Sequence, residues 1–491
     1  MSEAEQPKLS DVLRDRREKL ERLREAGIDP FPPEFADREE IGEVRAAHEG
    51  LAPGIETESR HRVAGRLVGR RGHGKACFLD LRDASGQIQL HAREDLLGEE
   101  PYKVLVELDL GDIIGVEGTA LATQRGGELS LAIDHWRLLA KSLRPPPDKF
   151  HGLEDVETRY RQRELDLIAN EESRHLFAQR ARTVSEVRRW LDERGFVEVE
   201  TPVLQPLYGG ALARPFTTHH NALDRDLYLR IATELYLKRL VVGGIDKVYE
   251  LGKDFRNEGI SHKHNPEFTM LEWYEAYADY GDAAARLEKV VGAAAAAAGY
   301  EGELDFASPW RRVTFSAAIL EATGVDIDAN RDRESLVAAV RTAGVEMEGL
   351  EHLTWPQLVD DLLSKHVEPT LVQPTFVLDH PIEISPFAKA HRSKPGATER
   401  FEAYANGMEI ANAFTELNDP DEQRARFEAQ ARYAADGDDE SQPYDEAFVQ
   451  ALEQGMPPTA GLGLGIDRLA MVLTGRDTIR DVVLFPALRG N

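Results

Sequence analysis

Three segments of the 491-residue chain place arginine, carboxylate and glycine residues at spacings that suit phosphate and amine chemistry. The first, residues 248–274, reads as a strand, a polar loop and a second strand. Side chains alternate along a strand, so Phe268, Met270, Glu272 and Tyr274 are expected on one face. A ring, a carboxylate and a phenol on one face suit a pocket that stacks a base and holds an ammonium group.

The first strand of this segment is expected to carry Arg256 and Glu258 on one face by the same alternation. The alternative is a half-exposed hairpin whose charged side chains are solvated.

The second segment, residues 400–419, contains Asn406-Gly407, the strongest short signal for a two-residue hairpin turn. A two-residue loop places Tyr404 opposite Glu409, and it places Glu402 on the same face one diagonal step away. Two neighbouring carboxylates repel each other unless a cation lies between them. Mg²⁺ binds through a few carboxylates plus substrate phosphates, so it is the cation that we expect here.

Asn412 and Glu416 have the opposite parity to Glu409 in this segment. They enter the same pocket only if a β-bulge or a strong twist follows Glu409. An edge hairpin with scattered surface glutamates is the alternative interpretation.

The third segment, residues 461–469, alternates glycine with leucine and ends in Asp467-Arg468. Ile466 stands where a dinucleotide-binding fingerprint needs glycine, and the Gly-Lys-Ser/Thr of a phosphate loop does not occur. The pattern indicates a strand that other backbone approaches closely, running into a helix near Asp467. The helix dipole disfavours Arg468 in the first turn, and a phosphate group nearby would offset that cost.

Composition sets limits on the class of protein. The length predicts two or more domains, and no apolar run approaches the roughly 20 residues that span a bilayer, so no membrane partner is expected. Cys77 is the only cysteine, which fits a reducing cytoplasm. The net charge of −28 argues against a nucleic-acid partner, yet residues 60–91 hold seven arginines and lysines against two aspartates. This basic segment is either a contact surface or a solvated face.

The order of patterns along the chain predicts an α+β protein with several domains. Short alternating runs separated by turn signals predict a barrel of about five strands, of the oligonucleotide-binding (OB) kind. The predicted parts are an N-terminal helical extension (1–55), an OB-fold domain (56–140), a linker (141–160) and a larger domain (161–491) with a mainly helical insertion at about 283–370.

The three segments, in this order, resemble the signature motifs of class II aminoacyl-tRNA synthetases, and the details resemble lysyl-tRNA synthetase of the bacterial type. The resemblance covers nearly the whole chain, and it includes the following stretches: Gly195-Phe-Val-Glu-Val-Glu-Thr-Pro202, Glu234-Leu-Tyr-Leu-Lys-Arg239, Phe255-Arg-Asn-Glu-Gly-Ile-Ser261, His264-Asn-Pro-Glu-Phe-Thr269, Phe414-Thr-Glu-Leu-Asn-Asp419 and Gly461-Leu-Gly-Leu-Gly-Ile-Asp-Arg468.

The resemblance implies an antiparallel-sheet catalytic domain flanked by helices, an OB-fold barrel that reads the anticodon, and a homodimer whose interface includes a helix at about 180–194 and the strand through Pro202. It implies activation of L-lysine with ATP and its transfer to the 3′-terminal adenosine of tRNA(Lys), with Mg²⁺ as cofactor. The ATP residues it implies are Arg256, Glu258, His264, Asn265, Phe268, Glu402, Glu409 and Arg468, of which Arg256 and Arg468 are catalytic and Glu402 and Glu409 hold the metal. The lysine residues are Gly210, Glu234, Arg256, Glu272, Tyr274, Asn412 and Glu416, and the anticodon residues are Arg71, Phe78, Gln89 and Glu128.

Three small departures from the family pattern lie near the expected lysine pocket. Thr233 replaces the usual proline, and Ala413 and Thr415 replace the usual glycine and serine. They remove no polar group that the chemistry needs. The alternatives are an aspartate- or asparagine-specific synthetase, a ligase that attaches lysine to a protein, and a non-catalytic RNA-binding paralogue. The first has no use for Glu272 and Glu416, the second lacks the barrel, and the third is expected to lose the arginines or the metal carboxylates.

Overall fold

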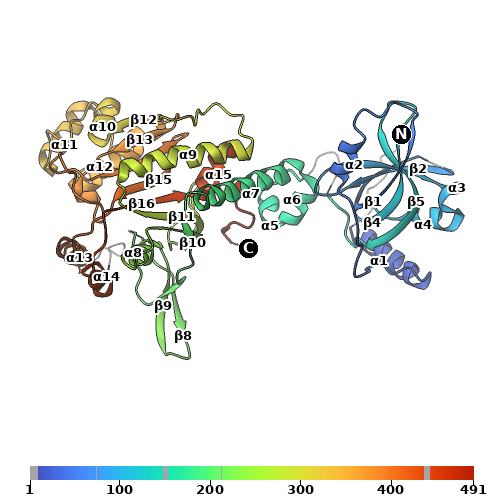
Figure 1. The fold of residues 1–491 in the computed structure, drawn as a ribbon, viewed down its shortest axis with the longest axis horizontal. Helices are drawn as coiled ribbons and strands as arrows, with labels where there is room; N and C mark the ends of the chain where they lie inside the picture. The colour runs from blue at the N-terminus through green and yellow to red at the C-terminus, as the bar shows by residue number, and fades with distance from the viewer. Residues whose placement is uncertain (1–8, 73, 148–152, 212, 436–442, 491) are drawn as a thin grey trace. The chain divides into compact units, whose positions relative to one another are not determined.

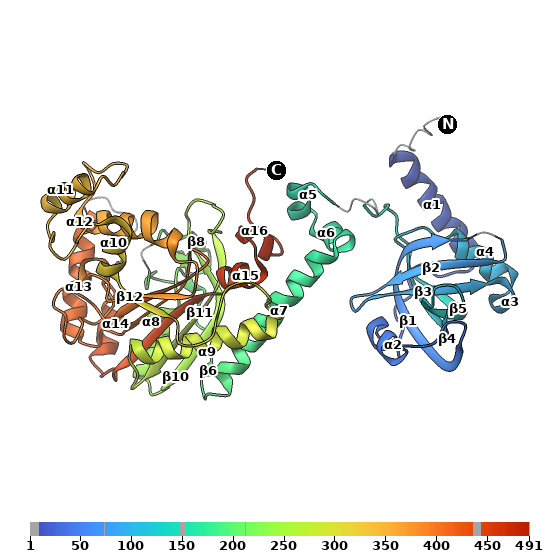
Figure 2. The same cartoon turned by 90° about the horizontal axis from the view of Figure 1, so that it is seen from above.

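The computed structural model describes residues 9–72, 74–147, 153–211, 213–435 and 443–490. The chain forms two compact units, and the first ends at Glu171. A small β-barrel makes up most of the first unit, and a large sheet with helices makes up the second (Figure 1, Figure 2). The predicted α+β fold class is confirmed. The domain boundaries stay predictions, and residues 148–152 of the predicted linker lie outside the described residues.

The barrel of the first unit is closed, with the strand order β1-β2-β3-β5-β4. Its strands are β1 (Glu56–Arg71), β2 (Ala76–Arg82), β3 (Gln87–Arg93), β4 (Ile113–Ala122) and β5 (Leu129–Ala140). Alternate residues of β2, namely Cys77, Leu79 and Leu81, are buried in the barrel core. Phe78 and Asp80 therefore belong to the opposite, outer face of β2. The first unit also contains the helices α1 (Leu9–Glu25), α2 (Ile41–Ala47), α3 (Glu94–Leu97), α4 (Glu99–Glu107), α5 (Val156–Arg161) and α6 (Arg163–Ala169).

The second unit is built on an eight-stranded sheet with the order β12-β13-β14-β15-β16-β11-β10-β6. The pairs are antiparallel except for β12 with β13 and β10 with β6. The strands are β6 (Val197–Glu198), β10 (Lys247–Phe255), β11 (Glu267–Ala276), β12 (Arg311–Thr314), β13 (Thr375–Leu378), β14 (Arg400–Ala405), β15 (Met408–Thr415) and β16 (Thr459–Gly465). A separate small sheet contains β7 (Leu204–Gln205), β8 (Thr217–His220) and β9 (Arg225–Leu229).

Helices cover the main sheet, and α7 (Glu171–Asp192), α9 (Tyr280–Ala298) and α15 (Ile466–Thr474) share one hydrophobic core with its central strands (Figure 1). The alanine run of α9 packs into this core, and a left-handed Gly299 ends the helix. The remaining α-helices are α8 (Glu234–Val242), α10 (Phe315–Thr323), α11 (Arg333–Ala343), α12 (Trp355–Leu362), α13 (Pro420–Ala435), α14 (Glu446–Leu452) and α16 (Ile479–Val482). Among the described residues, no helix is long and apolar enough to cross a membrane.

The region predicted as a mainly helical insertion, 283–370, is largely helical. Its first residues lie inside α9, which belongs to the main core, and it contains β12, which pairs with β13 at the edge of the main sheet. A second hydrophobic cluster, built from α10, α11 and α12, forms beside that edge.

The register of β14 and β15 confirms the predicted hairpin. Tyr404 pairs with Glu409 across the Asn406-Gly407 turn, and the register then shifts so that Glu402 pairs with Asn412. Ile410 is the extra residue of this bulge. The bulge restores parity, so Glu409 and Asn412 share a sheet face, as their use in one pocket requires.

The prediction that Arg256 and Glu258 lie on the first strand of the hairpin β10–β11 is wrong, because β10 ends at Phe255. The Arg256 N–H still donates to the carbonyl of Pro266 at 2.9 Å. Proline has no N–H to return a second bond, so the ladder stops and the chain leaves the sheet as a loop.

Candidate active site

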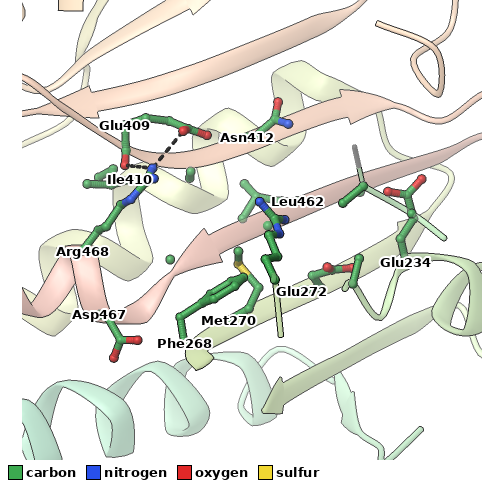
Figure 3. A pocket seen from close by; sticks show the side chains of 18 of the residues that line it. Glu234, Phe268, Met270, Glu272, Glu409, Ile410, Asn412, Leu462, Asp467 and Arg468 are labelled. Carbon is green, nitrogen blue, oxygen red and sulfur yellow. Dashed lines mark hydrogen bonds and ion pairs between the residues drawn. The ribbon is translucent and has the colours of Figure 1, made fainter. Parts of the chain in front are cut away.

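A cavity of about 360 Å³ opens over β11, β15 and β16 in the second unit (Figure 3). It lies within the usual volume range of small-molecule sites. Most of the residues that the sequence assigned to ATP and lysine line it, namely Gly210, Glu234, Arg256, Glu258, His264, Asn265, Phe268, Glu272, Tyr274, Glu409, Asn412 and Arg468. Glu402 and Glu416 do not line the cavity, but Glu402 contacts Arg400 and Glu416 approaches Gly461, and both of these residues line it. Figure 3 shows Arg468 and Glu409 at one end, and Glu234 and Glu272 at the other.

Glycines of the central strand β16 make room for side chains of both neighbouring strands. Gly461 pairs with Tyr274 on β11 and with Phe414 on β15. A Cβ atom at Gly461 would lie 1.9 Å from Oε1 of Glu416 and 2.5 Å from the Tyr274 ring. No such contact is possible, so glycine is required there for Tyr274 and Glu416 to keep these positions.

Arg468, in the first turn of α15, forms a charged network at the first end of the cavity. Its Nη1 atom lies 3.0 Å from the carbonyl oxygen and 2.9 Å from Oε2 of Glu409, and its Nη2 lies 3.2 Å from Nε2 of His264. Desolvation, followed by the charges of Arg468 and Lys263, lowers the pKa of His264 to about 4. The imidazole is therefore neutral near pH 7, and its Nε2 accepts from Arg468.

Asp467 fixes the start of α15 and so the direction of Arg468. Its Oδ2 accepts the Thr269 backbone N–H at 2.7 Å, and its Oδ1 lies 2.6 Å from Nη2 of Arg180 on α7. Asp467 and Arg180 thereby tie three elements together around the buried end of the helix. These contacts hold Arg468, which points into the cavity, in a fixed position.

Arg256 is the cation of the cavity that has no carboxylate partner among the described residues. Its guanidinium lies 5.1 Å from the Phe268 ring centroid, and its buried Nε has no hydrogen-bond partner there. A buried hydrogen-bond donor without a partner is costly, and an incoming anion would remove that cost. Arg256 is thus poised for a phosphate or carboxylate, whereas Arg468 already pairs with Glu409.

The two carboxylates predicted to hold Mg²⁺ each contact an arginine. Glu409 pairs with Arg468, while Glu402 lies 2.7 Å from Nη2 of Arg400 and accepts a hydrogen bond from the Tyr404 hydroxyl. No group of three or more histidine, cysteine or acidic residues among those described could hold a metal alone. Two carboxylates on one sheet face nevertheless fit Mg²⁺, which takes its other ligands from phosphate oxygens and water.

The second end of the cavity is closed by buried carboxylates. Glu234, Glu272 and Glu416 are each less than 9% exposed. Tyr274 donates to Oε2 of Glu272 at 3.3 Å, and the Thr233 backbone N–H donates to its Oε1 at 3.3 Å. A proline at position 233 would lack this donor. Burial, followed by the nearby charges of Asp254 and Glu234, raises the pKa of Glu272 to about 8.

Two cations of the site were not found from the sequence. Lys238 of α8 lies between Glu234 and Glu416 with its ammonium group fully buried. Arg400 lines the cavity and donates from Nε to Oδ1 of Asn412 at 3.1 Å. Glu234 and Lys238 are four residues apart on one helix, a spacing that could have suggested their ion pair. No local pattern connects either residue to Glu416.

Comparison with known proteins decides the family. A family model described as "tRNA synthetases class II (D, K and N)" matches residues 155–489, and one described as "OB-fold nucleic acid binding domain" matches residues 61–139. The chain belongs to the class II tRNA synthetases. The predicted family, its two-part architecture and an aminoacyl-tRNA synthetase activity are thereby confirmed.

Curated relatives of this synthetase match it along almost their whole length. Proteins named "Lysine--tRNA ligase" from Moorella thermoacetica and Roseiflexus castenholzii are each 51% identical to it. The alignments cover 98% of this chain in both cases, and 98% and 99% of the relatives. A relative of the same name from Carboxydothermus hydrogenoformans is 48% identical over 99% of both chains.

The outer face of the synthetase's barrel carries the residues predicted to read the anticodon. Phe78 stacks on His91 with ring centroids 4.7 Å apart, and Arg71 lies 2.9 Å from the buried Asp80. Gln89 accepts a hydrogen bond from Ser130, and Glu128 is exposed beside the start of β5. Ring stacking and hydrogen-bonding groups on one barrel face are typical of single-stranded nucleic-acid sites.

Proposed function

We propose that this class II synthetase is a lysine–tRNA ligase that acts through the residues of the cavity. It activates L-lysine with ATP, giving lysyl-adenylate and pyrophosphate, and transfers lysine to the 3′-terminal adenosine of tRNA(Lys). The observation that carries the proposal is that one cavity has two ends of opposite charge. Arg468 lies at one end, Arg256 lines the same cavity beside Phe268, and buried glutamates close the other end.

The glutamate end supports lysine over the amino acids of related synthetases. Glu272 and Tyr274 would hold the side-chain ammonium group together with Glu416, while Glu234 and Gly210 would lie near the α-amino group. An aspartate or asparagine side chain would place an acid or an amide against these carboxylates and bring no side-chain ammonium group to match them. Buried charges without a partner are costly, so such substrates would be rejected.

The arginine end supports the chemistry of adenylate formation. The lysine carboxylate attacks the α-phosphorus of ATP, and pyrophosphate leaves. Negative charge grows on the phosphate oxygens, and Arg256 is positioned to stabilise it because it has no competing carboxylate partner among the described residues. Phe268 and Arg468 would sandwich the adenine, with Glu258, His264 and Asn265 contacting the nucleotide.

Mg²⁺ is the cofactor that we propose for this end, held by Glu402 and Glu409 together with phosphate oxygens. The ion would neutralise phosphate charge when bound. Asn412, oriented by Arg400, would contact the lysine substrate. The second step needs no protein nucleophile, because the ribose hydroxyl of tRNA attacks the adenylate directly.

The barrel would bind the anticodon of tRNA(Lys) through Arg71, Phe78, Gln89 and Glu128. We also propose a homodimer, supported by three apolar side chains in β6, in β7 and between these strands that are 40–49% exposed, namely Val197, Val203 and Leu204. Large exposed apolar side chains become buried when a partner covers them. The substrates assign the enzyme to the cytoplasm, where tRNA, ATP and amino acids occur together.

Arginine-to-alanine variants test the assignment of the cavity. Arg256→Ala is expected to lower the kcat of lysine-dependent ATP–pyrophosphate exchange by about 10²-fold or more, because it removes preorganised charge from the phosphate. Arg286→Ala is the matched control, since Arg286 pairs with Glu275 away from the cavity. Exchange that survives Arg256→Ala intact would refute the role of Arg256.

A further inference from the structure

Lys238 holds a fully buried ammonium group behind the glutamate end of the cavity. Its Nζ lies 2.6 Å from Oε1 of Glu234 and 2.5 Å from Oε2 of Glu416. Three aromatic rings surround it at 5.5–5.9 Å from Nζ to the ring centroids, those of Phe387, Phe414 and Phe448. Carboxylates and aromatic faces are the groups that recognise an ammonium ion in a dry site.

Lys238 does not line the cavity, whereas its two partners, Glu234 and Glu416, lie between Lys238 and the cavity. Glu234 lines the cavity, and Glu416 directs its other oxygen, Oε1, toward the cavity-lining Gly461. Each carboxylate therefore has the protein's own ammonium group on one side and the cavity on the other. Lys238 reaches the substrate only through these two side chains.

The number of charges explains why such a cation is needed. Glu234, Glu272 and Glu416 supply three negative charges when ionised, and free lysine brings two ammonium groups. The lysine carboxylate is matched separately by Arg256. Without Lys238, one carboxylate would be left without a cation in a buried site, and it would take up a proton instead.

We propose that Lys238 is a specificity-determining positioning residue, an internal counter-ion that pairs with Glu234 and Glu416 and aims them so that the pocket matches the two ammonium groups of lysine. This inference rests on the proposed lysine-activating function. Burial would lower the pKa of Lys238, but Glu234 and Glu416 outweigh that effect and raise it. The ammonium group thus stays charged near pH 7.

The test replaces Lys238 with methionine, which has a similar length and no charge. In ATP–pyrophosphate exchange, Lys238→Met is expected to raise the KM for lysine by about tenfold or more and to change the KM for ATP by less than about twofold. Lys247→Met is the matched control. Lys247 also pairs with a glutamate, Glu275, and lies 5.5 Å from the Phe196 ring centroid, but unlike Glu234 its partner Glu275 does not line the cavity.

The number of protons released when lysine binds distinguishes an electrostatic role of Lys238 from a purely structural one. Lysine binding is followed by calorimetry in two buffers of different ionisation enthalpy. Lys238→Met is expected to release more protons per bound lysine than the wild type, because a further carboxylate must ionise. Lys238→Gln, which keeps a hydrogen-bond donor but no charge, is expected to behave in the same way and serves if the methionine variant does not fold.

Two results would overturn the role of Lys238. One is a lysine KM within about twofold of the wild-type value in both variants. The other is a fall in kcat with the lysine KM and the proton count unchanged. A wild-type enzyme that shows no lysine-dependent exchange would instead refute the proposed function itself, so the two failures are distinguishable.

Discussion

Lysine is expected to bind this enzyme more tightly as the pH rises, because Glu272 must lose a proton to meet the substrate ammonium group. Burial and the charges of Asp254 and Glu234 raise the pKa of Glu272 to about 8 in the empty cavity. The carboxyl group is therefore mostly protonated at pH 7. The lysine side chain keeps its own proton throughout, since its unperturbed pKa is about 10.4.

The size of the effect follows from proton linkage. If lysine binds only the enzyme in which Glu272 is ionised, the apparent KM for lysine exceeds its high-pH value. The factor is one plus ten to the power of the Glu272 pKa minus the pH. With a pKa of about 8, the KM falls about 25-fold between about pH 6.5 and about pH 8.5. Asp254, whose burial raises its pKa to about 6, and His264, with a pKa of about 4, titrate below this range.

The assay is lysine-dependent ATP–pyrophosphate exchange at saturating ATP, with the lysine KM measured across this pH range. Glu272→Gln is expected to bind lysine weakly with a KM that varies little with pH. Glu288→Gln replaces another buried glutamate, which pairs with Trp310 away from the cavity, and it is expected to keep the full dependence. A wild-type KM that is flat over the range would refute the argument from burial.

Three further predictions concern other parts of the enzyme. Gly461→Ala is expected to abolish lysine-dependent exchange, because the alanine Cβ atom would lie 1.9 Å from Oε1 of Glu416. Gly292→Ala in α9 is the control and is expected to stay active, because a Cβ atom there would meet nothing closer than 3.5 Å. Phe78→Ala is expected to lower kcat/KM for tRNA aminoacylation by about 5- to 150-fold through lost base stacking and to leave exchange unchanged; an equal loss in both assays would contradict the anticodon role. Ornithine, one methylene shorter, is expected to support exchange with a kcat/KM about 10- to 200-fold below that of lysine, and exchange with ornithine that is undetectable or equal to that with lysine would contradict a lysine-fitted pocket.

Strand parity and turn chemistry were sufficient to predict the framework of the site. The alternation along β11 predicts the face shared by Phe268, Glu272 and Tyr274, since a strand has only two faces. The turn at Asn406-Gly407 fixes the register of β14 and β15, and the parity conflict after Glu409 predicts the bulge that the structure contains. These rules depend only on residues close together in the chain, so a single sequence is sufficient to apply them.

Contacts between distant elements could not be predicted in this way. Lys238 and Glu416 meet because α8 packs against the sheet face that carries the cavity, and nothing in the spacing of their residues requires it. The role of Arg400 could not be predicted because its contact with Asn412 depends on the bulge. The end of β10 before Arg256 depends on the residue opposite, Pro266, rather than on the strand's own sequence.

The central claim is that the cavity selects lysine for activation by ATP. The most direct test measures ATP–pyrophosphate exchange by the wild-type enzyme with lysine, aspartate and asparagine as single substrates. Exchange with lysine, and none above background with the other two, is the predicted result. Exchange that depends on aspartate or asparagine, or none with lysine, would contradict the assignment of Glu234, Glu272 and Glu416 to an ammonium-binding pocket.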